Sequence, residues 1–370
     1  MMNFDKLERY IESLYTDKGI GMSDLIVMKD NAVIFRKFAG YKRPEKKVPM
    51  TGKEWYYIYS CTKMVSCVAT MQLIEKGIIK LEDPLYKFIP EFKEMYLKNS
   101  EKAKRPITIF HLMSMRGGLD YELFDKNMMD AKKNSEASTL DCIRAIAKKK
   151  LLFHPGDDYH YSLCHDILAG VVEVVSGMSF GEYIEKNIFA PLGMKNIKFR
   201  YEENEKDNFA SQFLYNEDGS FTDLELYNDY KLTSNYESGG AGLIASVEEY
   251  AKLPSALANG GVGATGNRIL KPESIEKFKM DTMYTGSREG MHEAGYSYGL
   301  GFRTLVSKNF AQKSPIGEFG WDGAMGCYYF IDTENHLSCF YGTHMASEHG
   351  FIYTDVHPKI RNLIYESLGL

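Results

Sequence analysis

A long apolar segment, residues 60–76, constrains this chain more than any other. Val65 and Leu73 belong to a set of apolar residues that recur at helical spacing, and Gly77 follows as a typical residue beyond a helix end. The pattern predicts a helix over residues 60–76. A polar, aromatic run at 54–57 comes just before it, and the first turn of this helix carries several polar residues.

Two of those polar residues, Ser60 and Lys63, lie one turn apart on the same face of the predicted helix, with Cβ atoms roughly 5–6 Å apart. A serine hydroxyl is a poor nucleophile until a base takes its proton. A lysine can be that base only when burial and the positive end of the helix dipole lower its pKa. The pair therefore predicts a nucleophile and its base. The alternative, a capping serine followed by an exposed lysine, is the commoner meaning of so short a pattern.

Composition and charge are those of a globular chain with room for two lobes. The 370 residues are 44% hydrophobic and 26% charged, and the net charge is -5. This charge gives no reason to expect nucleic acid or an anionic membrane as partner. The six cysteines are scattered and form no C-x-x-C pair, which argues against a disulfide framework or a zinc site. Without an apolar leader or a membrane-length run, the sequence predicts a reduced, cytoplasmic protein. The predicted nucleophile and its base need no metal or organic cofactor.

Strand-like segments lie near both ends of the chain and helix-like segments between them. The β-like runs are 24–28, 32–38, 296–306, 317–332 and 336–343. The helical patterns are 3–16, 60–76, 107–115, 140–149, 166–175, 247–257 and 358–368. This order predicts one lobe made from both termini, residues 1–60 and 240–370, and an inserted, mostly helical lobe, residues 61–239. The polar, tyrosine-rich stretch 201–237 has no sustained period and predicts a long loop that walls a pocket.

Two further segments carry candidate functional groups. Pro155-Gly156 forces a turn shortly before Tyr161. A loop tyrosine can pass protons if nearby cations lower its pKa; the alternative is a packed ring with a hydrogen-bonded hydroxyl. Residues 318–326 contain three glycines within a β-like run. Glycines weaken a strand unless something must approach its backbone, as a substrate carbonyl does when N–H groups bind it.

In order and spacing these segments resemble the serine β-lactamase-like hydrolases, which include class C β-lactamases, D,D-peptidases and family VIII carboxylesterases. The similarity covers most of the chain. It extends to the segments 48–51, 77–85 and 107–119 and to the glycines at 239, 240 and 242. The resemblance implies an α+β fold in which N- and C-terminal helices flank an antiparallel sheet, a mostly helical lobe is inserted, and the active site lies at the junction.

The resemblance also implies a role for each matching residue. Ser60 would be the acylated nucleophile, Lys63 its base or the electrostatic support for one, and Tyr161 the proton shuttle to the leaving group. The backbone N–H groups of Ser60 and Ala324 would form the oxyanion hole. The sequence leaves open which of Lys63 and Tyr161 takes the first proton.

Two departures from the family pattern concern the substrate. Leu163 stands where β-lactamases and peptidases usually have Asn, and Trp321-Asp322-Gly323 replaces a motif that usually begins with Lys or His. Losing a cation and an amide donor, and gaining Asp322, disfavours an anionic ligand. A Trp-x-Gly motif resembles the family VIII esterases. We therefore expect Trp321, Asp322 and Gly323 to contact the substrate, and Ser60 to cleave small, neutral carboxylic esters.

Three other functions remain open on the sequence alone. The nearest is a β-lactamase or a D-amino-acid peptidase or amidase, which shares the same acyl-enzyme chemistry. A second is a ligand-binding relative that acylates once or never. The third is acyl transfer to another alcohol or amine. In each case the expected partner is a small ester or amide, and the sequence does not determine the oligomeric state.

Residues 177–181 match G-x-S-x-G, the nucleophile elbow of another hydrolase fold. That elbow needs a strand before its serine, whereas the preceding residues favour a helix. Ser179 and Glu182 instead form S-x-x-E, which predicts a capping box opening a helix over 180–187.

Histidines gather in two other places. His154, His160 and His165, with Asp158 and Cys164, follow no familiar metal-ligand spacing. Ordinary polar contacts explain them, so we predict no metal there. A second group, which follows the last β-like run and is expected to border the pocket, consists of His344, Glu348 and His349.

Overall fold

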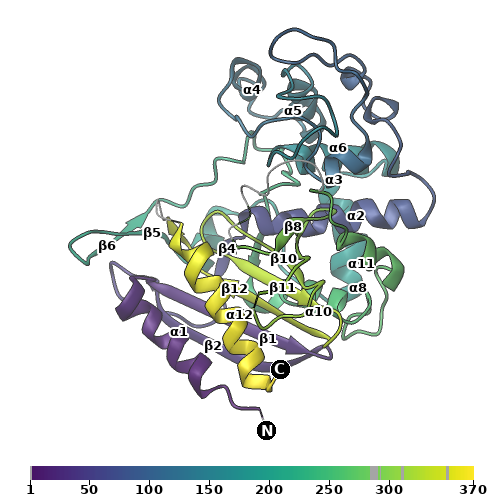
Figure 1. Ribbon diagram of the computed structural model, residues 1–370. Coiled ribbons are helices and arrows are strands. Elements are labelled where there is room, and N and C mark those ends of the chain that lie inside the picture. Colours follow the sequence, from purple (N-terminus) through teal and green to yellow (C-terminus); the bar gives the residue numbers. More distant parts are fainter. Residues whose placement is uncertain (1, 284–290, 292, 310–311, 347–349) are drawn as a thin grey trace.

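An antiparallel sheet is the central element of the computed structural model, which describes residues 2–283, 291, 293–309, 312–346 and 350–370 (Figure 1). Its eight strands follow the order β3-β2-β1-β12-β11-β10-β9-β8. They are β1 (Met22–Lys29), β2 (Ala32–Arg43), β3 (Val48–Pro49), β8 (Tyr296–Tyr298), β9 (Arg303–Leu305), β10 (Phe319–Asp322), β11 (Tyr328–Asp332) and β12 (Leu337–Gly342). At the centre β1 pairs with β12, from Asp24↔Gly342 to Lys29↔Leu337, so the two ends of the chain build one sheet.

Successive side chains along β11 and β12 point to opposite faces of the sheet, and both faces are apolar. Phe330 points toward the C-terminal helix α12 (His357–Leu368), where its ring stacks on Tyr365 at 5.7 Å. Phe340 of β12 pairs with Tyr329 of β11 and points to the other face of the sheet, where its ring lies 4.9 Å from the ring of Tyr250. Helix α1 (Asp5–Lys18) lies beside α12 in front of the sheet (Figure 1). The expected sheet with flanking N- and C-terminal helices is confirmed.

The opposite face is covered by α9 (Val247–Tyr250) and α10 (Lys252–Ala258), which contact β1, β11 and β12. The sequence predicts one helix here with a kink or an early end at Pro254. The structure ends α9 before Ala251 and places Pro254 in the first turn of α10. A proline is tolerated there because its missing N–H has no intrahelical partner in a first turn.

Most of the remaining helices pack together around α2 (Lys63–Glu75) and α6 (Cys164–Ser176), above the sheet in Figure 1. They are α3 (Ile109–Met113), α4 (Lys126–Lys132), α5 (Thr139–Ile146) and α7 (Phe180–Ile184). Helix α8 (Ala190–Leu192) lies beside the sheet, where it contacts α10, and α11 (Pro272–Phe278) follows later in the chain. The expected capping box opens α7: Ser179 Oγ accepts from the Glu182 N–H at 3.2 Å, and Glu182 Oε2 accepts from the Ser179 N–H at 2.9 Å.

The stretch 201–237 is not the unstructured loop that its composition predicts. It contains a hairpin, β5 (Gln212–Tyr215) and β6 (Phe221–Leu224), which projects at the side of the molecule (Figure 1). Strand β13 (Met345–Ala346) adds to β5 in parallel and completes a small sheet. Strands β5 and β6 are each only four residues long, and β13, which pairs with β5, comes from the far end of the chain. No local pattern therefore reveals this small sheet. A further pair joins β4 (Trp55–Tyr57) to β7 (Ile244–Ser246).

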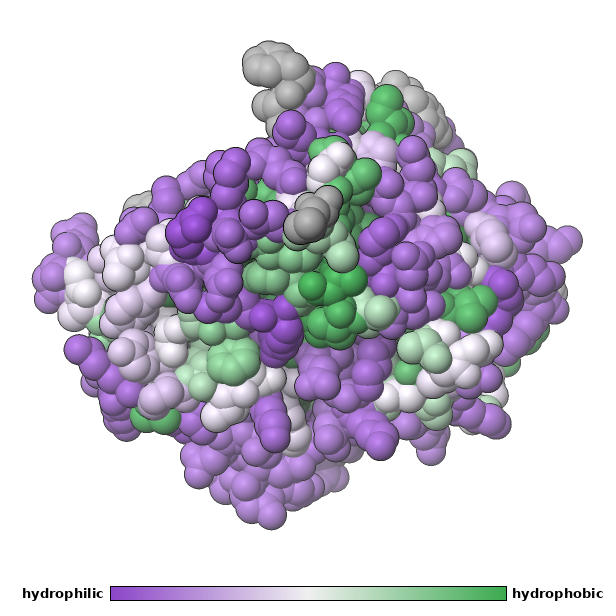
Figure 2. Space-filling model, turned by 90° about the horizontal axis from the view of Figure 1, so that it is seen from below, coloured by the Kyte–Doolittle hydropathy of each residue, from purple (hydrophilic) through white to green (hydrophobic). Residues whose placement is uncertain are grey.

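Among the described helices, none is by itself long and apolar enough to cross a membrane. One pair, Cys164–Ser176 with Phe180–Leu192, reaches the necessary length and composition together, but it is bent by 79°. The face of the molecule seen in Figure 2 is mostly hydrophilic, with a smaller group of hydrophobic side chains near its centre.

Candidate active site

Ser60 lies in a short 3₁₀ turn, Tyr59–Thr62, that joins strand β4 to helix α2. The turn is anchored on both sides: the Ile58 N–H donates to the Leu243 carbonyl at 3.1 Å, and the Tyr59 hydroxyl donates to the Tyr227 carbonyl at 3.0 Å. Tyr59 has a φ of 45°, an uncommon conformation for a bulky residue. Such backbone strain persists only where neighbouring contacts impose it. The turn leaves Ser60 9% exposed at the start of a buried helix.

Lys63 is fully buried, and its ammonium nitrogen makes three short contacts. Nζ lies 3.0 Å from Ser60 Oγ, 3.1 Å from the Tyr121 hydroxyl and 2.8 Å from the Gly240 carbonyl oxygen. Burial lowers the pKa of Lys63 to about 7, although the negative charge of Asp166 acts in the opposite direction. A large fraction of Lys63 is therefore an uncharged amine near neutral pH. The structure thus brings together the two residues that the helical spacing paired.

Tyr161 approaches Ser60 from the other side. Its hydroxyl donates to Ser60 Oγ at 2.6 Å and accepts from Trp321 Nε1 at 3.2 Å. Its ring stacks between Trp321, at 5.5 Å, and Tyr121, at 5.4 Å. These aromatic neighbours keep water from the hydroxyl, and the desolvation raises the pKa of Tyr161 well above its ordinary value. Tyr161 therefore keeps its proton at neutral pH.

The end of strand β10 lies against the backbone that carries Ser60. A Cβ atom added to Gly323 would lie 2.5 Å from the Ile58 carbonyl oxygen, so only glycine permits this approach. The turn that follows is closed by a hydrogen bond from the Gly326 N–H to the Gly323 carbonyl at 2.8 Å. Within the described part of the chain, neither the Ser60 N–H nor the exposed Ala324 N–H has a hydrogen-bond acceptor. Both donors are available to a ligand's carbonyl oxygen.

We expect Gly323→Ala to push the end of β10 away from Ile58. The free energy of unfolding should fall by about 1–3 kcal/mol, as for other overpacked sites, which chemical denaturation measures. Ester turnover should also fall, by about tenfold or more, because Ala324 moves with the strand end. Gly177→Ala is the matched control: its φ is 68° but nothing lies within 4 Å of the added Cβ. Its activity should be unchanged. Wild-type activity in Gly323→Ala would show that the close approach has no role in the site.

The structure corrects the expected contact between Asp322 and the substrate. Along β10, Trp321 points toward Tyr161 and Asp322 therefore points to the opposite face. Its carboxylate accepts from Arg303 Nη1 at 2.8 Å and lies 2.7 Å from His357 Nδ1. Because its carboxylate is paired with the Arg303 guanidinium on the face away from Tyr161, Asp322 neither contacts the substrate as predicted nor gives a reason to exclude an anionic ligand.

Two residues of the site have no signal in the sequence. Tyr121 contacts Lys63 from 58 positions along the chain. Asp166, buried in α6, accepts from the Ser238 hydroxyl at 2.6 Å and from the Gly240 N–H at 3.3 Å. It thereby orients the glycine turn whose Gly240 carbonyl meets Lys63. The glycines mark a close approach, but nothing in their spacing points to a carboxylate or a tyrosine as partner.

The other sequence candidates lie elsewhere. Leu163 is buried beside α6, where its N–H donates to the Asp120 carbonyl at 3.3 Å, so it offers no amide to a ligand. His344 is buried between the carbonyl oxygens of Ala210 and Tyr57. Its companions Glu348 and His349 lie outside the described residues. Where the structure describes the chain, no group of three or more His, Cys, Asp or Glu side chains could hold a metal ion.

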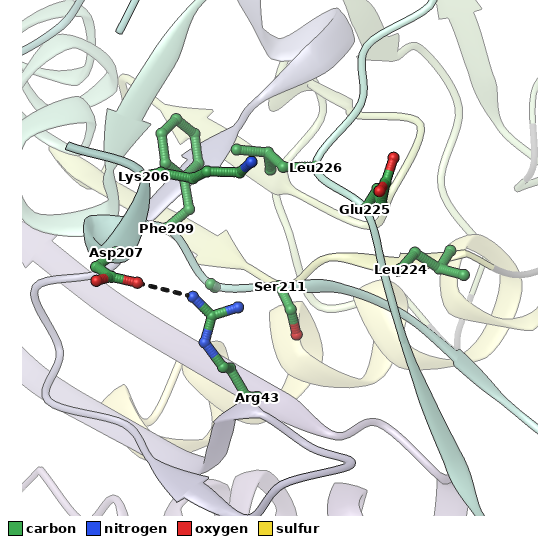
Figure 3. A pocket seen from close by; sticks show the side chains of 9 residues that line it. Arg43, Lys206, Asp207, Phe209, Ser211, Leu224, Glu225 and Leu226 are labelled. Atoms are coloured by element: carbon green, nitrogen blue, oxygen red, sulfur yellow. Dashed lines mark hydrogen bonds and ion pairs between the residues drawn. The ribbon is translucent and has the colours of Figure 1, made fainter. Parts of the chain in front are cut away.

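A pocket of about 230 Å³ lies near the base of the β5–β6 hairpin (Figure 3). Arg43 and Asp207 form an ion pair of 3.2 Å on one side of it. Phe209 and Leu226 line it and also belong to the small apolar cluster that includes Tyr59. Tyr59, the residue before Ser60, therefore belongs to the same apolar cluster as two residues that line this pocket. None of the residues around Ser60 described above lines the pocket itself.

Comparisons with known proteins identify the family and the fold. The family model described as Beta-lactamase matches residues 7–350. Esterase EstB from Burkholderia gladioli is 26% identical over 345 residues, which are 87% of this chain and 86% of that protein. The solved structure of EstCE1, described as a hydrolase with promiscuous acyltransferase activity, has a TM-score of 0.83 and 24% identity over 98% of both chains.

A mutant of simvastatin synthase from Aspergillus terreus has a TM-score of 0.78 and 17% identity, covering 98% of this chain and 95% of that one. At these identities the two solved structures establish the shared fold. The family match spans nearly the whole chain and includes the segments that carry Ser60, Lys63, Tyr161 and Trp321. The resemblance stated from the sequence is confirmed, and the chain belongs to the beta-lactamase family.

Proposed function

We propose that this chain hydrolyses small carboxylic esters through an acyl-enzyme on Ser60. The observation that carries the proposal is the hydrogen-bonded array around Ser60 Oγ, with Lys63 Nζ at 3.0 Å and the Tyr161 hydroxyl at 2.6 Å. A nucleophile flanked by a base and a proton donor is the arrangement that acyl transfer needs. The family and the esterase-named relative both support a serine hydrolase.

The two pKa shifts favour Lys63 over Tyr161 as the first base. Burial lowers the pKa of Lys63 to about 7, so its neutral form is readily populated. Burial raises the pKa of Tyr161 well above its ordinary value, so a tyrosinate is strongly disfavoured. A neutral Lys63 can donate to the Gly240 carbonyl and the Tyr121 hydroxyl while its lone pair accepts the Ser60 proton.

The reaction then follows from the positions of these groups. Ser60 Oγ attacks the ester carbonyl carbon and its proton passes to Lys63, while the oxyanion accepts hydrogen bonds from the Ser60 and Ala324 N–H groups. When the carbon–oxygen bond of the alcohol breaks, the Tyr161 hydroxyl donates its proton to the leaving oxygen. At this stage Lys63 carries the proton taken from Ser60, and its positive charge balances the negative charge of the Tyr161 oxygen. Water then attacks the acyl carbon and gives a proton to the Tyr161 oxygen. As the bond from the acyl carbon to Ser60 Oγ breaks, Lys63 returns its proton to Oγ, which releases the acid and restores the site.

The substrate class rests on what surrounds Ser60. Trp321 presents an aromatic ring, stacked on Tyr161, where other members carry a cation. Leu163, which stands where others have an amide donor, is buried and supplies none. An apolar, uncharged wall favours a neutral ester over an anionic β-lactam or peptide carboxylate. The esterase name of the relative from Burkholderia gladioli supports the same substrate class. Six free, buried cysteines support a reducing compartment, and we propose the cytoplasm.

The test combines covalent labelling with a comparison of substrates. The protein is treated with a fluorophosphonate and digested, and the modified peptide is identified by mass spectrometry. Hydrolysis of p-nitrophenyl butyrate, a chromogenic cephalosporin and a D-alanyl-D-alanine peptide is then measured. We expect the label on Ser60 and turnover of the ester far above the other two. Preferred turnover of the cephalosporin or the peptide would favour the β-lactamase or peptidase alternative, and a label without turnover would favour the binding protein.

A further inference from the structure

A buried charged group lies behind the turn that carries Ala324. Asp322 Oδ2 accepts from Arg303 Nη1 at 2.8 Å, and Asp322 Oδ1 lies 2.7 Å from Nδ1 of His357, the first residue of α12. His357 Nε2 lies 3.1 Å from the Gly326 carbonyl oxygen. The imidazole, only 2% exposed, therefore bridges the strand before the turn and the last residue of the turn.

Both nitrogens of His357 face groups that can only accept a hydrogen bond. A carboxylate and a carbonyl have no proton to donate, so the imidazole is the only possible donor in either contact. The Asp322 carboxylate is shared with Arg303 of β9. Tyr328 of β11 stacks on the ring at 4.5 Å, and its other ring neighbours are Tyr341 and Tyr353. These contacts hold the imidazole in one orientation.

The turn links these contacts to the Ala324 N–H through the peptide group that joins Gly323 to Ala324. That N–H shares a planar peptide with the Gly323 carbonyl and points in the opposite direction, so holding the carbonyl holds the donor. The Gly323 carbonyl accepts from the Gly326 N–H at 2.8 Å and from the Tyr353 hydroxyl at 3.2 Å. Gly326 is in turn the residue whose carbonyl faces His357.

We propose that His357 is a positioning residue of the oxyanion site, which holds Gly326 and thereby keeps the Ala324 N–H aimed at the carbonyl that Ser60 attacks. The proposal rests on the proposed function, which makes that N–H a donor. A donor fixed before the reaction stabilises the transition state without reorganising during it. This role also accounts for Asp322 in the motif: its carboxylate holds Nδ1 of the positioning residue.

The test compares four variants by kcat and KM with p-nitrophenyl butyrate. His357→Phe keeps the stack on Tyr328 but has no donor, and we expect kcat to fall by about 10- to 100-fold while KM changes by less than about threefold. His357→Gln places an amide near Nε2, so it can still donate to Gly326 and should keep kcat within about fivefold of wild type. The shorter side chain of His357→Asn can reach Asp322 but not Gly326, so its kcat should fall as far as that of His357→Phe. Tyr328→Phe, which loses only a hydroxyl without a partner among the described residues, should match wild type.

A structural role alone would lower kcat equally in His357→Gln and His357→Asn, or in proportion to the loss of thermal stability, and that result overturns the proposal. If His357→Phe fails to fold, the Gln and Asn pair decides. Histidine nitrogen NMR of the wild type should show a proton on Nε2 of His357, the nitrogen that faces Gly326; a ring without that N–H also overturns the proposal. A wild type without ester turnover or a Ser60 label refutes the proposed function and this role together. An active wild type with a fully active His357→Phe refutes this role alone.

Discussion

Ser60→Ala should lose ester hydrolysis by about 10⁴-fold or more, because the acyl-enzyme has no other oxygen on which to form. The variant should fold normally, since Ser60 contributes a single hydroxyl to the packing of the turn. Initial rates with p-nitrophenyl butyrate, together with the intact mass after fluorophosphonate treatment, measure both expectations.

Ser179→Ala is the matched control, since Ser179 lies in the other serine motif of the chain. Its hydroxyl caps α7, so its loss should cost about 1 kcal/mol of unfolding free energy and leave turnover unchanged. Loss of activity in Ser179→Ala with retention in Ser60→Ala would contradict the whole arrangement around Ser60.

Lys63→Met should lower kcat by about 10²- to 10⁴-fold, the range that general bases contribute. Because the neutral amine is the active form, wild-type kcat/KM should rise with pH through about 7 and then level, as Lys63 loses its proton. The variant should lack this rise. Lys76→Met makes the same change at the exposed end of α2 and should keep the wild-type profile. A profile that keeps its rise in Lys63→Met would assign it to another group.

The same substitution should change how stability depends on pH. The pKa of Lys63 is about 7 in the folded protein and near 10.5 when the chain unfolds. Between these values the unfolded chain binds more protons, so the stability of the wild type gains from Lys63 as pH rises through that window. Below pH 7 the folded protein must hold a buried charge. Chemical denaturation from pH 6 to 10 should show a steeper rise for wild type than for Lys63→Met.

How far the sequence predicts the site depends on how local each contact is. Ser60 and Lys63 are one helical turn apart, so periodicity alone predicts that they meet. Tyr161 comes from another segment, and only the resemblance to a family connected it with Ser60. Tyr121 and Asp166 contact this group through packing between distant helices, for which a single sequence holds no period or spacing.

Two of the predictions are wrong for definite physical reasons. The motif predicts that Trp321, Asp322 and Gly323 all contact the substrate, but adjacent residues of a strand point to opposite faces, which separates Asp322 from Trp321. The composition of 201–237 predicts a loop and not the hairpin β5–β6, because its four-residue strands are stabilised by pairing with β13, which no local pattern reveals.

The pairing of β1 with β12 has a consequence for how the protein is made. Ser23 and Tyr341 are 318 positions apart, yet they share a hydrogen bond of 2.9 Å at the centre of the sheet. Closing so long a loop costs entropy before its contacts form, so such sheets fold slowly. A chain still emerging from the ribosome already holds Ser60, Lys63 and Tyr161, but the edge of β1 stays open until β12 arrives. Synthesis of the last strands, rather than of the nucleophile, therefore sets the moment at which activity begins.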